Sequence, residues 1–349
     1  MSAQTIVGMM VSKGNIDQAG KTGEAFGRAL GPNVLLGLQT DDLDRLNPPF
    51  SEFLERRRSE PWKGVFLWDR QCDDEWKKPT SSLPLPFYTG QGSFSYGGAF
   101  NRLMMLAIVA EASVLIRVDA GTAPESQFAS RLNGHLAHLD RYAVVSGKYH
   151  KRIALRDDFL GELDRPAFHQ IVKLHVGVDP LSQLTGGACF ALRVESGPPA
   201  IAFPGFLPVW GSDDAFFQSV DPGILVNADL VVDRSAPGQP LTGPEYPARV
   251  ACAAALANIH RRANLCARLV PNLDEVVDAG KNFLDQLRAS FPDVVQASQH
   301  GGAQRLLQER AVGLIEGYEN YIRLKYKWPE VCDQVKQMRS VLLNRARLR

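Results

Sequence analysis

Cysteine is scarce in this chain of 349 residues, and no two cysteines are close together in the sequence. A disulfide framework or a zinc site usually needs several cysteines at short, regular spacings. No such spacing occurs here, so we expect reduced thiols in a cytoplasmic protein. The five cysteines are Cys72, Cys189, Cys252, Cys266 and Cys332.

The chain also lacks a large excess of charge and a long apolar run. Its 39 lysines and arginines almost balance its 38 aspartates and glutamates, which leaves a net charge of +1. A balanced protein has no strong field to attract nucleic acid. No stretch approaches the roughly 20 apolar residues of a membrane span, and the first residues do not resemble a signal peptide. We expect a soluble protein with no nucleic-acid partner and no membrane span.

The first 120 residues contain short apolar runs that alternate with helix-like segments. Such runs are typical of parallel strands buried on both faces. The alternation predicts an α/β fold, with an open, mostly parallel sheet and helices on both faces. The expected strands are Thr5–Ser12, Asn33–Leu38, Gly64–Trp68 and Ser113–Val118, and the expected helices are Asp17–Leu30 and Phe100–Glu111. Residues 70–98, rich in proline, serine and glycine, predict a long loop.

The remainder of the chain changes from strand-like to helical patterns. Further strands are expected at Tyr142–Val145, Ile171–Val178 and Ala188–Val194. A stretch rich in proline, glycine and aspartate at 233–247 predicts a boundary between a catalytic domain, 1–240, and a helical region, 241–349. Prolines 271, 292 and 329 are expected to separate its helices. These helices are Ala248–Leu269, Leu273–Phe291, Gln304–Tyr326 and Pro329–Arg349.

Acidic residues follow three of the expected strands. Asp41 and Asp42 follow the second strand, Asp69 the third, and Asp119 the fourth. In open α/β sheets, ligands bind beyond the carboxyl ends of the strands. We therefore expect these acids to line one ligand site. The alternative for Asp119 is a structural aspartate that caps the next turn.

A second acidic feature is the pair Asp213 and Asp214 within the run Trp210 to Phe217. Carboxylates are costly to bury without a partner, so a pair among apolar residues favours the floor of a cleft. One of them could accept the proton of an attacking hydroxyl while the other orients it. The alternative is a solvated turn before a helix, with Ser212 or Asp213 as its N-cap. Trp210 could stack on a sugar or belong to the core.

Taken in order, these features resemble the broad inverting family of GT-A-fold glycosyltransferases that includes cellulose- and chitin-type synthases. Residues 186–193, GGACFALR, match its GG-A-x-x-x-R element, and residues 210–216, WGSDDAF, match its acidic pair before an aromatic residue. The resemblance covers about residues 3–235. It implies an enzyme that transfers a sugar from a nucleotide-sugar donor to a soluble acceptor, namely a natural product, a sugar or a peptide.

The resemblance also assigns roles to residues. It implies Asp213 or Asp214 as the catalytic base, and of the two we favour Asp214. The acceptor would be bound by Gly187, Phe190 and Trp210, and a metal by Asp119. The donor would be bound by Asp41, Asp42, Asp69, Asn101, Arg102 and Asp119.

One departure concerns the divalent cation, Mg²⁺ or Mn²⁺, that the family holds with an Asp-x-Asp motif. The motif reads Asp119-Ala120-Gly121 here, so its second carboxylate is missing. Asp119 could hold the ion with water or Asp213, because Mg²⁺ keeps several waters. Alternatively, Arg102 or Arg117 neutralises the leaving diphosphate and no metal is needed.

Two other functions remain open at this point. A nucleotidyltransferase would carry a glycine-rich basic loop after the first strand, where this chain has only Lys13-Gly14-Asn15. A non-catalytic binding or scaffold protein is favoured by Gly121 and disfavoured by the intact Asp213-Asp214 pair. The C-terminal helices could pack under the sheet, contribute to the acceptor site or form a homodimer.

Overall fold

The computed structural model describes residues 4–78, 82–84, 96–141, 144–150, 186–196, 225–234, 251, 272–290 and 297–348. Its strands are β1 (Thr5–Met10), β2 (Leu35–Gln39), β3 (Val65–Trp68), β4 (Val114–Val118), β5 (Thr122–Pro124), β6 (Val144–His150), β7 (Gly186–Arg193) and β8 (Leu225–Arg234). Its helices are α1 (Ile16–Leu30), α2 (Pro48–Ser59), α3 (Arg70–Lys77), α4 (Tyr96–Val109), α5 (Phe128–Ala137), α10 (Leu273–Ser290), α11 (Ala297–Gln337) and α12 (Arg339–Ala346), with short 3-10 turns at Gly31–Asn33 and His138–Asp140.

The described strands form one open sheet in the order β3-β2-β1-β4-β7-β6-β8-β5. Strands β1 to β4 are mutually parallel. Beyond them β7 runs antiparallel to β4 and to β6, β8 runs parallel to β6, and β5 closes the row antiparallel to β8. The prediction of an open, mostly parallel sheet is therefore confirmed.

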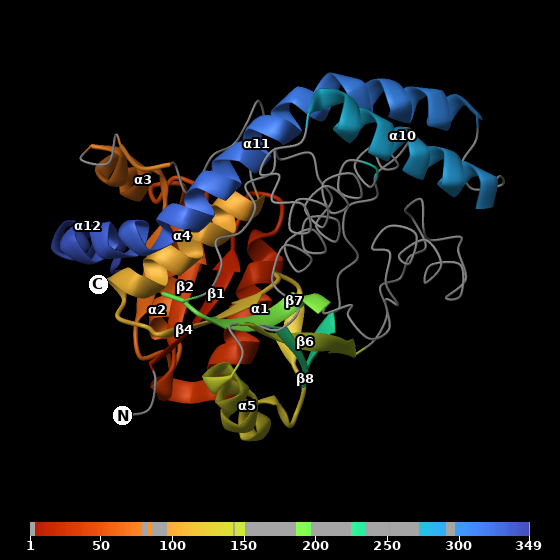
Figure 1. Ribbon diagram of the computed structural model, residues 1–349. Coiled ribbons are helices and arrows are strands. Elements are labelled where there is room, and N and C mark those ends of the chain that lie inside the picture. Colours follow the sequence, from red (N-terminus) through yellow and green to blue (C-terminus); the bar gives the residue numbers. More distant parts are fainter. Residues whose placement is uncertain are drawn as a thin grey trace.

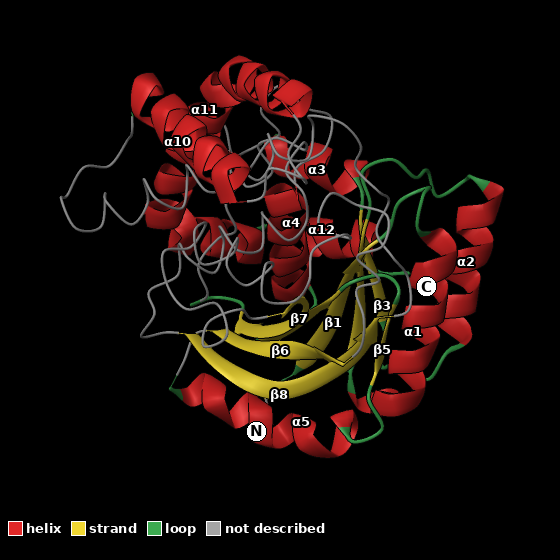
Figure 2. Cartoon of the chain, turned by 90° about the vertical axis from the view of Figure 1, so that its right-hand side faces the viewer, coloured by secondary structure: helices red, strands yellow, loops and turns green. Residues whose placement is uncertain are grey.

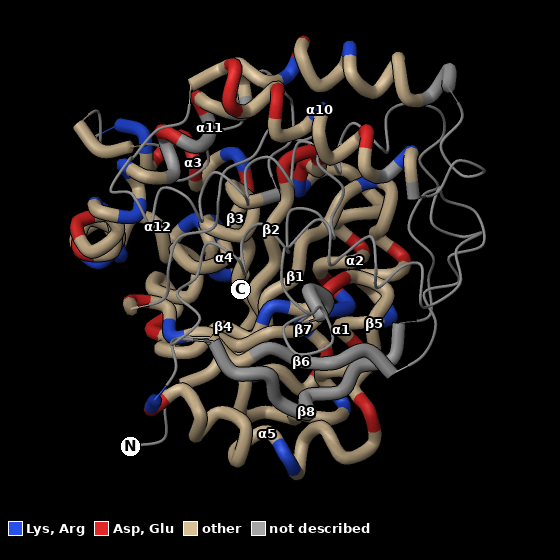
Figure 3. The backbone as a smooth tube through the Cα atoms, turned by 45° about the vertical axis from the view of Figure 1, so that its right-hand side comes forward, with Lys and Arg blue, Asp and Glu red and all other residues tan. Residues whose placement is uncertain are grey.

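Helices cover both faces of this sheet (Figures 1 and 2). Because successive side chains of a strand point to opposite faces, neighbouring residues enter different cores. Ile6, Leu35, Phe66 and Leu115 join the core with α4, α11 and α12, whereas Val7, Leu36, Val65 and Val114 join the core with α1, α2 and α5. Burial on both faces explains the continuous apolar runs of the sequence. Charged residues lie mostly on the helices and loops around the strands (Figure 3).

The prediction of a loop throughout residues 70–98 was wrong at both ends. Residues 70–77 form α3, and α4 begins at Tyr96 rather than at Phe100. Asp69 starts α3 as its N-cap, because its side chain accepts hydrogen bonds from the backbone N–H groups of Gln71 and Cys72. Helix α2, which begins with two prolines, was not predicted. Proline suits a first helical turn, where its missing N–H would have no helical partner anyway.

The prediction that Pro329 separates two helices was also wrong. Helix α11 continues through Pro329, and the break comes at Met338. An internal proline costs about 3 kcal/mol, which burial on both sides of it offsets. Leu324, Trp328 and Val331 are at most 2% exposed and pack against the sheet with α4.

The C-terminal segment continues this core to the edge of the sheet. Helix α12 packs beside α3 and β3, and Arg347 then pairs in an antiparallel bridge with Phe66. The Leu348 N–H donates to the Val65 carbonyl at 3.0 Å. Part of the outer edge of β3 is thereby paired, which protects it from pairing with another chain. The expected boundary at residue 240, the helix 248–269 apart from Ala251, and the strand 171–178 lie outside the described residues.

The structure also bears on membrane-spanning helices and on the state of the cysteines. Within the part of the chain that the structure describes, no helix combines the length and apolar character needed to cross a bilayer. Cys72, Cys189 and Cys332 are buried free thiols, and burial raises the pKa of each to about 12.

Candidate functional site

The acids after β2, β3 and β4 lie along one edge of the sheet, because these strands are parallel and in register. Met10 pairs with Gln39, and Gln39 pairs with Trp68. On the other side of β1, Gly8 pairs with Arg117. Asp41, Asp69 and Asp119 each follow within two residues of this row. The edge carries three acids at the carboxyl ends of parallel strands, where α/β sheets bind ligands.

Asp41 is held by two neighbours and keeps one carboxylate oxygen without a partner. Gln39 Nε2 donates to its Oδ1 at 2.8 Å, and Arg102 Nη1 forms an ion pair with the same oxygen at 3.1 Å. Oδ2 is buried and accepts no hydrogen bond. Burial raises the pKa of Asp41, Arg102 opposes this shift, and Asp73 adds to it. A buried acceptor with no partner is costly unless a ligand supplies a donor.

Arg102 is the centre of a buried charge network that includes a residue the sequence analysis missed. Its Nε donates to Asp73 Oδ1 at 3.0 Å, and its Nη2 donates to Asp73 Oδ2 at 2.7 Å. Trp68 Nε1 donates to Asp73 Oδ1 at 2.8 Å. Arg102 is only 5% exposed and Asp73 only 7%. The only local sign of Asp73 was its place beside Cys72 on the inward face of α3.

Asp69 and Asp42 are engaged differently. Asp69 Oδ1 caps α3, while Oδ2 forms an ion pair with Arg45, another residue that was not predicted. Asp69 is thus occupied on both oxygens. Asp42 is exposed and accepts a hydrogen bond from the backbone N–H of Lys13 at 3.2 Å, which ties the loops after β1 and β2 together.

At the end of β4, Asp119 forms an ion pair through Oδ1 with Arg117. The Arg117 guanidinium is 2% exposed and lies 5.6 Å from the centroid of the Phe190 ring. Asp119 Oδ2 is buried and accepts no hydrogen bond. Phe190 is itself 2% exposed and packs edge-on against Phe100, so direct contact with an acceptor is not favoured. Asn101, beside Arg102 on α4, is fully buried.

The missing second acid of the Asp-x-Asp pattern has a backbone reason. Gly121 has φ 89°, a conformation that side-chain-bearing residues rarely adopt. Its N–H donates to Thr22 Oγ1 at 2.9 Å, which ties this turn to α1. Among the described residues, no three His, Cys, Asp or Glu side chains gather as a metal site. Asp119 can offer a cation its Oδ2 alone unless Arg117 yields Oδ1.

The remaining predicted site residues are the candidates for the catalytic base and for acceptor binding. Asp213, Asp214 and Trp210 lie outside the described residues. Gly187 lies in β7, the strand that pairs with β4. The catalytic and acceptor assignments for these residues therefore stay predictions.

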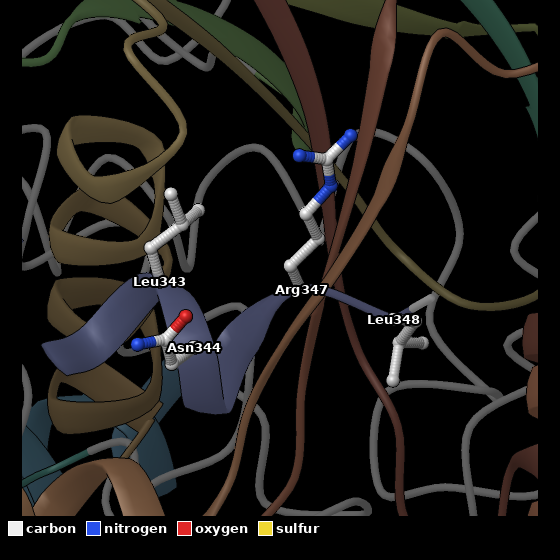
Figure 4. A pocket seen from close by; sticks show the side chains of 4 residues that line it. All are labelled: Leu343, Asn344, Arg347 and Leu348. Atoms are coloured by element: carbon white, nitrogen blue, oxygen red, sulfur yellow. The ribbon is translucent and has the colours of Figure 1, made fainter. Parts of the chain in front are cut away.

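A pocket with a volume of about 520 Å³ lies elsewhere, beside the C-terminal segment (Figure 4). Leu343, Asn344, Arg347 and Leu348 line it. The backbone N–H of Leu348 donates a hydrogen bond to the carbonyl of Val65, the first residue of β3. Val65 and Asp69 are four positions apart along the chain, or about 13 Å at 3.3 Å per residue. Among the residues that the structure describes, none of the predicted site residues lines this pocket.

Comparisons with known proteins gave similarity at the level of structure. No protein-family model and no curated protein matches the chain. The chain is similar to glucosyl-3-phosphoglycerate synthase from Mycobacterium tuberculosis, solved with Mg²⁺ and UDP, with 15% identity over 78% of this chain and 83% of that one and a TM-score of 0.44. It is also similar to mannosyl-3-phosphoglycerate synthase from Rubrobacter xylanophilus, with 15% identity over 76% of each chain and a TM-score of 0.45. At these values the similarity concerns the arrangement of the chain alone.

Proposed function

We propose that this protein is a glycosyltransferase that moves a sugar from a nucleotide-sugar donor to a soluble acceptor, namely a natural product, a sugar or a peptide, by an inverting displacement. The supporting observation is the edge formed by Asp41, Asp69 and Asp119 at the carboxyl ends of parallel strands. Two carboxylate oxygens there, Asp41 Oδ2 and Asp119 Oδ2, are buried and accept no hydrogen bond. Such oxygens suit the hydroxyl and N–H donors of a nucleotide sugar, or a cation beside its diphosphate.

Some of the strand-end acids are placed to contact the donor, and others support the structure of the site. Asp41 and Asp119 are the acids with an oxygen left over, so we assign them direct donor contacts. Asp69 caps α3 and pairs with Arg45, so it supports the site rather than contacting the donor. Asp42, exposed beside the loop after β1, can contact the donor from the solvent side.

The chemistry requires a base and charge stabilisation. In an inverting displacement, the acceptor oxygen attacks the anomeric carbon as the bond to the diphosphate breaks, and the acceptor proton passes to the base. Asp213 or Asp214 supplies that base in our proposal, since carboxylates accept a proton from a hydroxyl that becomes acidic in the transition state. Arg102 and Arg117 are the buried positive charges nearest the strand-end acids. In our proposal, their positive charges stabilise the departing diphosphate electrostatically.

A divalent cation would find one free carboxylate oxygen at Asp119. When bound, Mg²⁺ or Mn²⁺ would neutralise diphosphate charge and would keep most of its water ligands. Asp119 alone fits such a weak site. Metal assistance is therefore proposed as an addition to the arginines.

A thermal-shift panel tests the donor site. UDP-, GDP- and ADP-sugars, each with and without Mg²⁺ or Mn²⁺, are compared on the wild type, Asp119→Asn and the control Asp140→Asn. Asp140 has an 81% exposed side chain and pairs with Arg193, which lies opposite Val114 at the start of β4, whereas Asp119 follows its end. A ligand that binds only the folded state raises the melting temperature. We expect one nucleotide class to stabilise the wild type and the control but not Asp119→Asn. A panel with no shift for any nucleotide sugar would overturn the proposal.

The other candidate functions give different outcomes. A nucleotidyltransferase would be stabilised by nucleoside triphosphates and would release pyrophosphate. A scaffold would bind nucleotide sugars without transfer. For the partner, we propose that a second copy uses the C-terminal helices, which light scattering of the purified protein would reveal as twice the 38.4 kDa mass.

A further inference from the structure

The buried Asp73 and the partly buried Asp41 share the guanidinium of Arg102, and they share it unequally. Asp73, on α3, receives hydrogen bonds from Arg102 on both of its oxygens, at 2.7 to 3.2 Å. Asp41, after β2, has an ion pair with Nη1 at 3.1 Å. The side chains of Arg102 and Asp73 are 6% and 9% exposed, and that of Asp41 is 21% exposed. Asp73 is therefore the better-fixed anchor, and Asp41 is the partner that faces the edge of the sheet.

The pair with Asp73 fixes the orientation of the Arg102 guanidinium. A bidentate arginine–carboxylate pair restricts the plane and direction of the guanidinium. Trp68 restricts Asp73 in turn, because its Nε1 donates to Asp73 Oδ1 at 2.8 Å. Asp41 Oδ1 is engaged by Gln39 and Arg102. Asp41 Oδ2 is the oxygen that remains.

We propose that Asp73 is a positioning residue, which acts through Arg102 to fix Asp41 and to set the pH range in which Asp41 accepts a hydrogen bond from the bound nucleotide. This inference rests on the proposed function, because it concerns the same site. Asp73 touches no ligand in this scheme.

The charged groups around Asp41 determine the direction in which its pKa shifts. Arg102 faces it from α4, Asp73 from α3, and Asp42 follows it along the chain, while Gln39 donates to it from β2. Burial raises the pKa of Asp41. An ionised carboxylate accepts a hydrogen bond more strongly than a protonated carboxyl, so nucleotide binding should weaken as pH falls through that pKa. Removing the Asp73 charge lowers the pKa of Asp41. Removing the Arg102 charge raises it.

Shifts of opposite direction in the pH dependence of binding distinguish a positioning role of Asp73 from a merely structural one. If Asp73 only stabilised the core, Asp73→Asn and Arg102→Gln would both weaken folding, and neither would shift the pH dependence of binding in a particular direction. In the proposed network, Asp73→Asn moves the acid limit of binding to lower pH and Arg102→Gln moves it to higher pH. Arg102→Lys keeps the charge and should restore the wild-type limit at lower overall affinity, because lysine cannot form the bidentate pair.

Calorimetric titration of the full chain with UDP, GDP and ADP between pH 5 and pH 8 measures the limit. The control is Asp140→Asn, whose exposed carboxylate pairs with Arg193. We expect the loss of affinity from pH 7 to pH 5 to differ by about tenfold or more between Asp73→Asn and Arg102→Gln, since one nearby charge changes a carboxyl pKa by about one to three units. Equal limits in the wild type and both variants would overturn the inference.

A second measurement does not depend on nucleotide binding. The carboxyl ¹³C resonance of Asp41, assigned with Asp41→Asn, should titrate at lower pH in Asp73→Asn and at higher pH in Arg102→Gln. If none of the three nucleotides binds the wild type, the proposed function fails while this titration still tests the network. An unchanged Asp41 titration in both variants would overturn the inference even if nucleotides bind.

Discussion

Gly8 of β1 lies directly beside Gly37 of β2 in the parallel register. A Cβ on Gly8 would be 2.6 Å from Leu115 Cδ1 and 3.3 Å from Leu103 Cδ2, and a Cβ on Gly37 would be 2.9 Å from Ile6 Cδ1 and 3.4 Å from Leu106 Cδ2. The two glycines let side chains of α4 settle directly on the sheet. Because α4 also carries Asn101 and Arg102, this close packing supports the position of the site.

We expect Gly8→Ala to destabilise the fold by about 1–3 kcal/mol, the usual cost of overpacking a core. Gly134→Ala is the matched control, because the same change in α5 meets nothing within 4 Å. There it should stabilise the helix by up to about 1 kcal/mol. Urea denaturation of both variants measures the difference. Equal stability of the two variants would contradict the packing argument.

Asp41→Asn should stabilise the free protein and weaken nucleotide binding. The pKa of Asp41 is raised in the folded state, so between the unfolded and the folded pKa the native protein holds a proton that the unfolded chain releases. Stability from this group is present below the unfolded pKa and declines as pH rises through the folded pKa. Asparagine removes that loss, and Asp73 still holds Arg102.

Melting temperatures of the wild type and Asp41→Asn, at pH 5 and pH 8 without ligand, test this prediction. The advantage of Asp41→Asn should be larger at pH 8. A variant that is less stable than the wild type at pH 8 would show that the carboxylate contributes more through Arg102 than it costs by burial.

The sheet was predictable where burial alone determines the pattern. Strands buried on both faces must be apolar throughout, so β1 and β4 stand out in the sequence. Helix α3 does not, because its residues RQCDDEWK are mostly polar and its inward face depends on a partner elsewhere. That partner is Arg102, 29 residues from Asp73.

The site likewise contains residues that could be predicted from the sequence and residues that could not. Asp41 and Asp119 were predicted because they follow strands, and strand ends define the ligand edge. Arg45 and Asp73 were not, because nothing local indicates which acid meets which base after folding. The length of α11 was missed because local rules place a helix end near Pro329, whereas packing of Trp328 on the sheet carries the helix through it.

Leu348→Pro tests the pairing that covers the edge of β3. Proline removes the N–H that donates to the Val65 carbonyl at 3.0 Å. Arg347, with φ −71° and ψ 121°, already has a conformation that a residue before proline prefers. We expect Leu348→Pro to be less stable than Leu348→Ala by about 0.5–1.5 kcal/mol, the net value of a hydrogen bond. Urea midpoints that coincide would mean that this bond adds nothing.

Asp213→Asn and Asp214→Asn test the catalytic base, with Asp140→Asn as the control. The true base should lose turnover by about 10²-fold or more, the usual contribution of positioned acid–base groups. Nucleotide-induced stabilisation should persist, because the base acts on the acceptor. Wild-type turnover in both single variants would exclude the pair as the base.

Metal removal should have a small effect on the proposed activity. Asp119 Oδ1 is paired with Arg117, and Gly121 holds a backbone conformation that disfavours a second acid. Because affinity for hard cations increases with the number of charged oxygen ligands, we expect millimolar Mg²⁺ or Mn²⁺ dependence or none. The measurement is nucleotide-induced stabilisation and turnover after EDTA treatment, followed by titration with each ion.

Asp119→Asn is the variant to compare in that titration, because asparagine keeps an oxygen beside Arg117. Alanine would remove the carboxylate from a 2% exposed guanidinium, and breaking a buried ion pair costs about 3–5 kcal/mol. Asp119→Asn should lose nucleotide affinity with little change in unliganded melting temperature. Tight, stoichiometric binding of Mn²⁺ to the wild type would contradict the prediction. It would require a further acid, such as Asp213, to complete the site with Asp119.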